Sequence, residues 1–221
     1  MDLNKHLEFF NPTDVGSVHI IGCGAIGSNV AIMLTRLGFP KIHLYDFDTV
    51  GTHNITNQQY RFKDVGLPKV DALAEQLKEI NPEVIVTKHN EGWKPGTNLN
   101  NIVVLAVDNM DVRRGVVDDN KLNNNIKVML DFRMRLTDAQ HYACDWSSFD
   151  NIGNFMSTMS FSNEEADQAT PVSACGTSLS VAPTVWTIVS VGVSNLMKFL
   201  KDKELNKIIL IDAFTPSVTA I

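Results

Sequence analysis

The chain has 221 residues, of which 44% are hydrophobic and 20% are charged. This composition is typical of a soluble globular protein and excludes a largely disordered chain. The 19 Lys and Arg residues against 25 Asp and Glu residues give a formal net charge of -6, which argues against nucleic acid as the main partner. The three cysteines include no CxxC pair, so we expect neither a disulfide framework nor a zinc site. We expect the protein in a reducing compartment, most simply the cytoplasm.

No segment has the pattern of a membrane span. Residues 1–17 lack a basic stretch leading into an apolar run, so a signal peptide is not expected. The longest apolar stretch, 181–200, contains Pro183 and several hydroxyl and amide side chains. We therefore expect a packed helix there, and no membrane partner.

The first half alternates between short apolar strands and amphipathic helices. The strands are predicted at 18–21, 41–45, 84–87, 102–107 and 126–130. The intervening helices are predicted from apolar residues at spacings of three and four, over 26–37, 69–80 and 112–122. This order requires parallel pairing through right-handed crossovers. It predicts an α/β fold with a Rossmann-like, mostly parallel sheet and helices on both faces.

The pattern is looser beyond Asp131. A strand is predicted over 141–146, a helix over 183–200 and a strand over 207–211, so the C-terminal part should extend the sheet. The segment 151–174 is rich in Ser, Asn and acidic residues and is interpreted as a loop over one sheet edge. We expect a single domain over 1–221, with a nucleotide-binding half at 17–132 and a substrate- and dimer-facing half at 133–221.

A glycine-rich sequence, Gly22-Cys23-Gly24-Ala25-Ile26-Gly27, lies between the first predicted strand and helix. In that context Gly22 allows a tight turn, Gly24 lets the backbone approach a phosphate or ribose, and Gly27 lets the helix pack closely. The helix N-terminus offers free N–H groups to an anion. Asp46, 22 residues after Gly24, is the expected ribose acceptor. By itself this pattern also fits an NAD(P)-dependent oxidoreductase.

More polar residues follow at the predicted carboxyl ends of the strands. Asp48 comes two residues after Asp46, past the end of the second strand, and Asp108 with Asn109 follows the fourth. Because the carboxyl ends of parallel strands share one edge, we expect Asp46, Asp48 and Asp108 to converge on one crevice. Additional carboxylates and Lys69 suit ATP with Mg²⁺ better than they suit NAD.

The succession GxGxxG, DxDxV, NxxxQ, GxxK, NP and DN resembles the ThiF/MoeB/HesA superfamily, which includes the adenylation domains of ubiquitin-activating enzymes. The resemblance covers most of 17–132. The later segments Asp131–Met134 and Cys175-Gly176 are similar to short ThiF-like proteins, including those of phages. The resemblance implies an ATP-dependent adenylyltransferase that activates the C-terminal carboxylate of a ubiquitin-like, sulfur-carrier or peptide substrate as an acyl-adenylate. It also implies a homodimer.

The resemblance further implies roles for individual residues. Asp46 would hold the ribose, Asn54 and Lys69 the phosphates, and Asp108 the Mg²⁺, with Asp48 near the metal and the α-phosphate. The residues expected at the nucleotide are Gly22, Gly24, Ala25, Ile26, Gly27, Asp46, Asp48, Asn54, Asn57, Gln58, Lys69, Asp108 and Asn109.

One position departs from the family pattern. Relatives usually carry NxxRQ, whereas this chain has Asn57 before Gln58. Asparagine brings neither a charge nor a bidentate fork to a phosphate. Arg61 is the local candidate to replace the missing cation, and is counted with Asp108, Lys69 and Asn54 as catalytic; an arginine of a partner subunit is the other candidate. A catalytically impaired nucleotide-binding scaffold is therefore a second alternative to the enzyme.

Three further features have competing interpretations. Cys175 precedes a glycine in a predicted loop and is interpreted as structural or incidental. Arg133 and Arg135 share one face of a segment, which would either bind a substrate carboxylate or face solvent. The apolar helix with Val185, Trp186, Val189 and Val193 would lie either between subunits or under the sheet.

Overall fold

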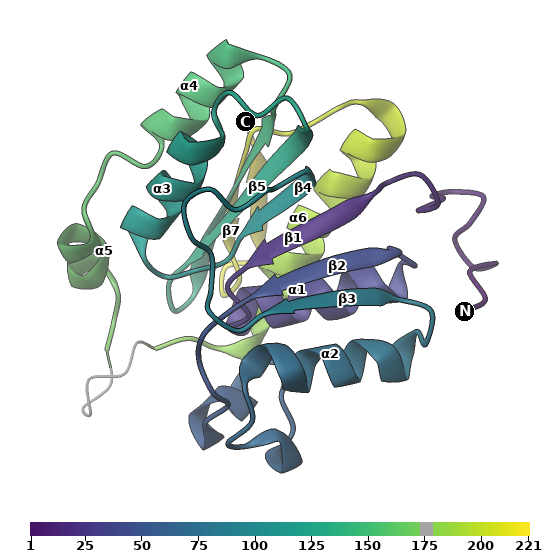
Figure 1. Cartoon of the computed structure of the whole chain (residues 1–221). Helices are drawn as coiled ribbons and strands as arrows, with labels where there is room; N and C mark the ends of the chain where they lie inside the picture. The colour runs from purple at the N-terminus through teal and green to yellow at the C-terminus, as the bar shows by residue number, and fades with distance from the viewer. Residues whose placement is uncertain (173–178) are drawn as a thin grey trace.

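The computed structural model describes residues 1–172 and 179–221 (Figure 1). One eight-stranded sheet has the order β3-β2-β1-β4-β5-β6-β7-β8. The strands are β1 (Ser17–Ile21), β2 (Lys41–Tyr45), β3 (Ile85–His89), β4 (Asn101–Leu105), β5 (Ile126–Met134), β6 (Asp138–Asp145), β7 (Ile208–Asp212) and β8 (Ser217–Ala220). The first five pair in parallel and the last three in antiparallel. The predicted mostly parallel sheet, extended by the C-terminal part, is confirmed.

Helices cover both faces of the sheet, as predicted. Three pack on one face: α1 (Ala25–Arg36), α2 (Lys69–Ile80) and α6 (Ala182–Asp202). The opposite face is covered by α3 (Met110–Asn120) and α4 (Phe149–Ser157). Figure 1 shows α5 (Asn163–Ala169) beyond α3 at the side of the molecule, and two short 3₁₀ helices, η1 (Thr52–Thr56) and η2 (Phe62–Asp64), follow β2. No helix in the described ranges is long and apolar enough to cross a membrane.

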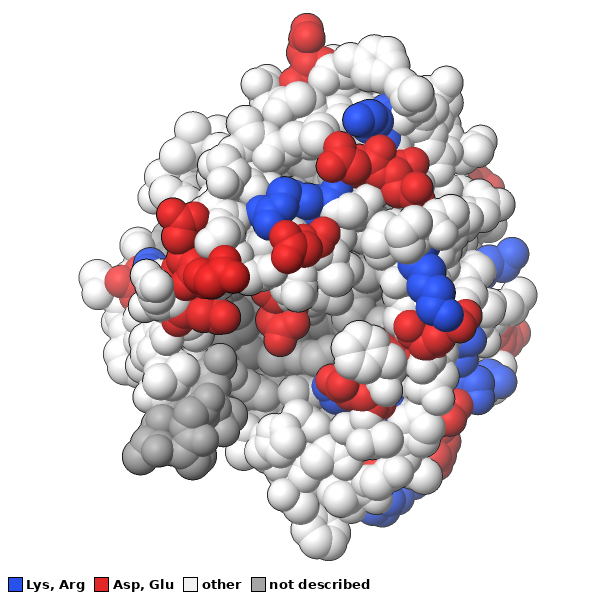
Figure 2. Space-filling view, turned by 60° about the vertical axis from the view of Figure 1, so that its left-hand side comes forward, with Lys and Arg blue, Asp and Glu red and all other residues white. Residues whose placement is uncertain are grey.

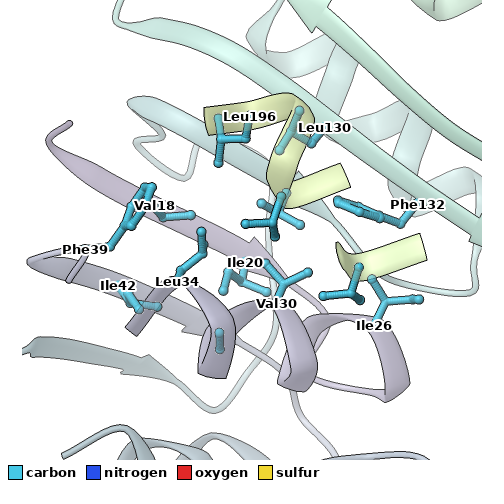
Figure 3. Close-up of a cluster of buried hydrophobic side chains, with 14 of the residues drawn as sticks. Val18, Ile20, Ile26, Val30, Leu34, Phe39, Ile42, Leu130, Phe132 and Leu196 are labelled. Atoms are coloured by element: carbon cyan, nitrogen blue, oxygen red, sulfur yellow. The ribbon is translucent and has the colours of Figure 1, made fainter. Parts of the chain in front are cut away.

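Alternation along the strands divides the core into two clusters. On β1, Val18 and Ile20 point toward α1 and α6, whereas Ile21 points toward α3. Figure 3 shows the first cluster, where side chains of β1, α1 and β5 meet Leu196 of α6. Gly192 of α6 lets the ring of Phe132 approach the helix backbone, because an added Cβ would lie 2.6 Å from the ring Cζ.

The predicted loop at 151–174 is wrong over its described part. The structure has α4 and α5 there, each with a serine as its N-cap: the Ser148 hydroxyl accepts from Asn151 N, and the Ser162 hydroxyl accepts from Glu165 N. Glu165 completes a capping box at α5. The Ser- and acid-rich composition therefore marks helix starts rather than a loop. The exposed strand β8 was not predicted either, since its few residues follow a turn at the surface.

The apolar C-terminal helix lies under the sheet. Val185, Val189 and Val193 of α6 are buried against it, whereas Trp186 is 58% exposed. Of the two interpretations of this helix, packing against the sheet is confirmed for the three valines. Cys175 lies outside the described residues.

Candidate functional site

The glycine loop lies between the ends of β1 and β4. Gly22 has a φ of +93°, and its N–H donates to the Tyr45 carbonyl at 2.8 Å. An added Cβ at Gly22 would lie 2.8 Å from the Ala106 carbonyl oxygen, and one at Gly27 would lie 2.9 Å from the Gly22 carbonyl carbon. At Gly24 a Cβ would meet no atom of the described residues within 4 Å. Gly22 and Gly27 thus close the turn, and Gly24 faces open space at the start of α1, where an anion can approach.

Asp46 links the glycine loop to the end of β2. Its Oδ2 accepts a hydrogen bond from the Cys23 amide at 2.7 Å, and its Oδ1 accepts from the Asp48 amide at 2.9 Å. Burial raises the pKa of Asp46, while these amides and the nearby Lys69 act in the opposite direction. The two bonds fix the carboxylate, and each oxygen keeps a lone pair that can accept from a ribose hydroxyl.

Lys69 and Asp48 form an ion pair at the crevice. The chain after β2 runs beside the chain before α2, with bonds from Val50 N to Leu67 O and from Lys69 N to Asp48 O, both 2.9 Å. This pairing brings Lys69 Nζ to 2.7 Å from Asp48 Oδ2. The lysine is buried while the carboxylate is half exposed. A phosphate could therefore compete for the lysine from the open side.

The loop through η1 holds the other predicted phosphate residues. Asn54 is buried, and its Oδ1 accepts from the Gly51 amide at 2.7 Å. The Asn57 side-chain amide donates to Ser180 Oγ, just before α6, and the Asn57 backbone carbonyl accepts from Asn29 Nδ2 at 3.2 Å. Gln58 Oε1 is buried and has no hydrogen-bond partner in the described part of the chain. Asn57 therefore ties the loop to α6 instead of pointing a cation at the crevice.

The structure does not bring Arg61 into the crevice. Its guanidinium pairs with Asp64, with Nε at 3.1 Å from Oδ2, and with Glu79, with Nη1 at 2.7 Å from Oε2. Glu79 lies ten residues after Lys69 on α2, which is about 15 Å along the helix. The prediction that Arg61 replaces the missing arginine is therefore not supported, because ion pairs hold its side chain elsewhere.

Asp108 is exposed after β4, at the carboxyl edge of the sheet. The neighbouring Asn109 is the N-cap of α3, since its Oδ1 accepts from the amides of Asp111 and Val112 at 2.9 and 3.0 Å. Its side chain thus has a structural role that was not predicted. Among the described residues, no hydrogen bond or ion pair engages the Asp108 carboxylate, which can offer a hard oxygen ligand to a cation.

A buried charge cluster lies behind Asp108. Arg113 of α3 pairs with Asp131 of β5, and Arg133 pairs with the same carboxylate at 2.6 Å. Burial, and secondarily Arg133, lowers the pKa of Arg113 to about 9, while the Asp108 carboxylate opposes this shift. Two guanidinium groups, of Arg113 and Arg133, share the single buried carboxylate of Asp131. The cluster therefore carries a net positive charge, which acts on Asp108 from the interior of the protein. Of the two arginines expected either to bind a substrate carboxylate or to face solvent, Arg133 belongs to this cluster, and Arg135 pairs with Asp138 at 2.8 Å.

Several site residues gave no signal in the sequence. The buried Tyr60 donates from its hydroxyl to the Cys23 carbonyl at 2.7 Å and so braces the glycine loop. Arg113, Asn29 and Ser180 likewise act through distant partners. A motif search finds none of them, because each partner is a backbone group or a residue far along the chain.

The charge of the crevice favours a cation as well as a nucleotide. In the part of the chain that the structure describes, the carboxylates Asp46, Asp48 and Asp108 outnumber the lysine Lys69 at the crevice. Figure 2 shows a hollow on this side of the molecule with acidic side chains on its rim. A bare polyphosphate would meet net repulsion there, whereas a polyphosphate with Mg²⁺ would bring its own counter-charge. The glycine loop, the fixed carboxylate and the lysine fit a nucleotide, and the exposed carboxylates fit its metal.

Curated relatives share parts of this chain. The ubiquitin-like modifier-activating enzyme 5 of Caenorhabditis elegans is 31% identical over 134 residues, which are 58% of this chain and 29% of that protein. Its namesake in Arabidopsis thaliana is 46% identical over 70 residues, 32% of this chain and 16% of the relative. This chain thus spans less than a third of the length of these relatives.

Solved structures share the fold. MccB of E. coli superposes with a TM-score of 0.73 at 18% identity, covering 99% of this chain and 63% of MccB. PaaA superposes with a TM-score of 0.69 at 18% identity, covering 93% of this chain and 63% of PaaA. The ThiF family matches residues 14–221. With that match over nearly its whole length, and with the glycine loop and carboxylates assembled at one sheet edge, the chain belongs to the ThiF family.

Proposed function

We propose that this chain is an ATP-dependent adenylyltransferase that activates the C-terminal carboxylate of a ubiquitin-like, sulfur-carrier or peptide substrate. The observation that carries the proposal is the meeting of the glycine loop, Asp46, the Lys69–Asp48 pair and Asp108 at one edge of the sheet. The names of the relatives support it, as do the MccB structures with ATP and with MccA.

In the proposed reaction, a carboxylate oxygen of the substrate attacks the α-phosphorus of ATP. The bond from that phosphorus to the oxygen bridging to the β-phosphate breaks, and its electron pair leaves with pyrophosphate. Lys69 Nζ donates to the phosphates, Asp46 accepts from the ribose, and the backbone at Gly24 allows close approach. The protein contributes mainly fixed charge and position, which is the usual demand of phosphoryl chemistry.

A magnesium ion is part of the proposal. Asp108 would hold it, with Asp48 nearby. Bound Mg²⁺ would supply positive charge that offsets the carboxylates of Asp46, Asp48 and Asp108. Arg61, the local candidate to replace the arginine missing at Asn57, is held in ion pairs with Asp64 and Glu79. We therefore propose that the positive charge still needed at the phosphates comes from Arg113, which lies behind Asp108, and from a residue of a partner subunit. The protein would then act as a homodimer. The proposed location is the cytoplasm.

Nucleotide binding tests the first step. Thermal melting with MgATP should show a rise in Tm, and NAD at the same concentration should not. At about 100 times Kd the stabilisation is about 2.7 kcal/mol, or about 5–10 °C for a chain of this size. Lys69→Ala should abolish the rise. Lys63→Ala is the matched control, because that lysine is exposed and pairs with Glu75.

Pyrophosphate exchange tests the chemical step. Peptides with a free C-terminal carboxylate, including ones ending in Gly-Gly, should support ATP–pyrophosphate exchange, and the same peptides with a C-terminal amide should not. Asp108→Asn should lower the exchange rate by at least about a hundredfold, the usual effect of losing one electrostatic group. MgATP binding without exchange on any such peptide or carrier protein would favour the impaired scaffold. A Tm rise with NAD alone would favour the oxidoreductase.

A further inference from the structure

Two consecutive residues that follow the loop through η1, Gln59 and Tyr60, reach back to the glycine loop. The buried Tyr60 donates from its hydroxyl to the Cys23 carbonyl at 2.7 Å. The Gln59 amide donates to Ser28 Oγ at 3.1 Å, and the Ser28 hydroxyl in turn donates to the Gly24 carbonyl at 2.7 Å. Gln59 and Tyr60, called here the brace, therefore hold two consecutive carbonyls of the glycine loop, one directly and one through Ser28.

A second set of contacts ties the brace to the start of α1. Gln59 Nε2 donates to Asn29 Oδ1 at 2.6 Å, and Asn29 Nδ2 donates to the Asn57 carbonyl at 3.2 Å. Both Ser28 and Asn29 are buried near the start of the helix. Side chains outside the GxGxxG and NxxxQ motifs thus join the glycine loop and the loop that carries Asn57 into one unit.

The brace fixes the direction of one backbone amide. In a trans peptide the carbonyl and the N–H of the next residue point in opposite directions. Because the Cys23 carbonyl is directed at Tyr60, the Gly24 N–H is directed away from that ring. In residues 1–172 and 179–221 the Gly24 N–H has no acceptor, and α1 has no side-chain N-cap. This amide is therefore available to an anion at the helix start.

We propose that Gln59 and Tyr60 are positioning residues for the nucleotide, because the brace presents the Gly24 N–H to a phosphate. This inference rests on the proposed function, since it names the residues that preorganise the phosphate site. With Asn57 in place of the family's arginine, Lys69 is the cation at the crevice among the described residues. The phosphates therefore depend more on backbone amides whose direction is fixed before the nucleotide binds.

The surroundings of Tyr60 keep its hydroxyl a donor. Burial raises the pKa of this phenol, and Cys23 with the carboxylates of Asp46, Asp48 and Asp64 acts in the same direction. The hydroxyl therefore stays protonated and keeps its hydrogen bond to the Cys23 carbonyl. On its other side, the Cys23 amide donates to Asp46 at 2.7 Å. Cys23 is thus held at both its N–H and its carbonyl, so a change at Tyr60 also reaches the Asp46 contact.

Calorimetric titration of Tyr60→Phe with MgATP tests the proposal, and Tyr45→Phe is the matched control. Each variant loses one buried phenol hydroxyl, but the Tyr45 hydroxyl has His19 Nδ1 as its partner, at 3.0 Å, rather than the glycine loop. Tyr60→Phe should raise the Kd for MgATP by about three- to tenfold, which corresponds to the net contribution of one hydrogen bond. Tyr45→Phe should bind MgATP as the wild type does, although both variants should unfold at lower urea concentrations.

Amide hydrogen exchange of the ligand-free chain gives a second readout, which does not depend on ATP. The Cys23 amide should exchange faster in Tyr60→Phe and at the wild-type rate in Tyr45→Phe. If Tyr60→Phe does not fold by circular dichroism, Ser28→Ala replaces it, because this change removes the link to the Gly24 carbonyl. Wild-type MgATP affinity in the folded variant would overturn the proposal. If the wild-type chain itself does not bind MgATP, the proposed function fails. Faster exchange at Cys23 would then still support the brace, and unchanged exchange would overturn it.

Discussion

Gly192 offers a test in which helix propensity and packing predict opposite signs. In a helix interior, Gly→Ala normally stabilises by up to about 1 kcal/mol, because alanine loses less backbone entropy on folding. Gly192 lies within α6, so propensity alone predicts that Gly192→Ala raises the free energy of unfolding.

The packing around Gly192 reverses that expectation. A Cβ there would lie 2.6 Å from Phe132 Cζ and 3.1 Å from His141 Nδ1. The Phe132 ring is 1% exposed and packs on His141 with centroids 4.6 Å apart, so it has little room to retreat. Overpacking of a well-filled core costs about 1–3 kcal/mol. We take the upper half of that range and expect a net destabilisation of about 1–2 kcal/mol after the gain in propensity.

The chain contains a matched control for this substitution. Gly153 also lies inside a helix, α4, and is exposed. An added Cβ there would meet no atom within 4 Å in residues 1–172 and 179–221. Gly153→Ala should therefore stabilise by about 0.5–1 kcal/mol. Equilibrium urea denaturation followed by circular dichroism measures both variants. Their unfolding free energies should change in opposite directions from the wild type and differ from each other by about 1.5–3 kcal/mol. A Gly192→Ala variant as stable as the wild type would refute the packing argument.

Two further predictions concern acid stability and the phosphate loop. Burial lowers the pKa of His141 to about 3 in the folded chain, whereas the unfolded chain binds a proton at this histidine below about pH 6.5. The free energy of unfolding therefore falls as the pH drops below about 6.5, by about 2 kcal/mol at pH 5. His141→Gln should remove that part of the loss between pH 8 and pH 5 in urea melts, with His53→Gln as control, and an unchanged pH slope would contradict it. Asn57→Arg should restore the family's cation and raise the rate of ATP–pyrophosphate exchange by at least about tenfold, which is less than the full rate enhancement that a phosphate-contacting arginine can give. Slower exchange would instead show that the Asn57 contact with Ser180 is needed.

The parts that could be predicted follow from short-range patterns. The glycine loop and Asp46 stand directly after strands, Asp108 follows β4 within a few residues, and parallel pairing brings such positions together at one edge. The helices α1, α2 and α3 follow from apolar spacing. Lys69 was assigned to the phosphates through the GxxK motif of the family resemblance.

The parts that were missed depend on distant partners. Asn57 and Ser180 are 123 positions apart, and no local pattern joins them. Arg61 lies in a segment near the motifs, but its ion pairs with α2 decide where its guanidinium goes. In the same way, Ser148 and Ser162 become helix caps only once their helices pack, which composition alone does not show.

The two hydrogen bonds that Asp46 accepts have a consequence for enzymology. The Cys23 amide bonds to the same carboxylate that is assigned to the ribose, so an Asp46→Ala variant would loosen the phosphate cradle while it removes the sugar contact. Its kinetic defect would combine two losses in one number. Deoxy analogues of ATP, used with the unmodified chain, delete the sugar hydroxyl alone and leave the glycine loop intact. Changing the ligand instead of the protein therefore separates the loss of the ribose contact from the loss of loop structure.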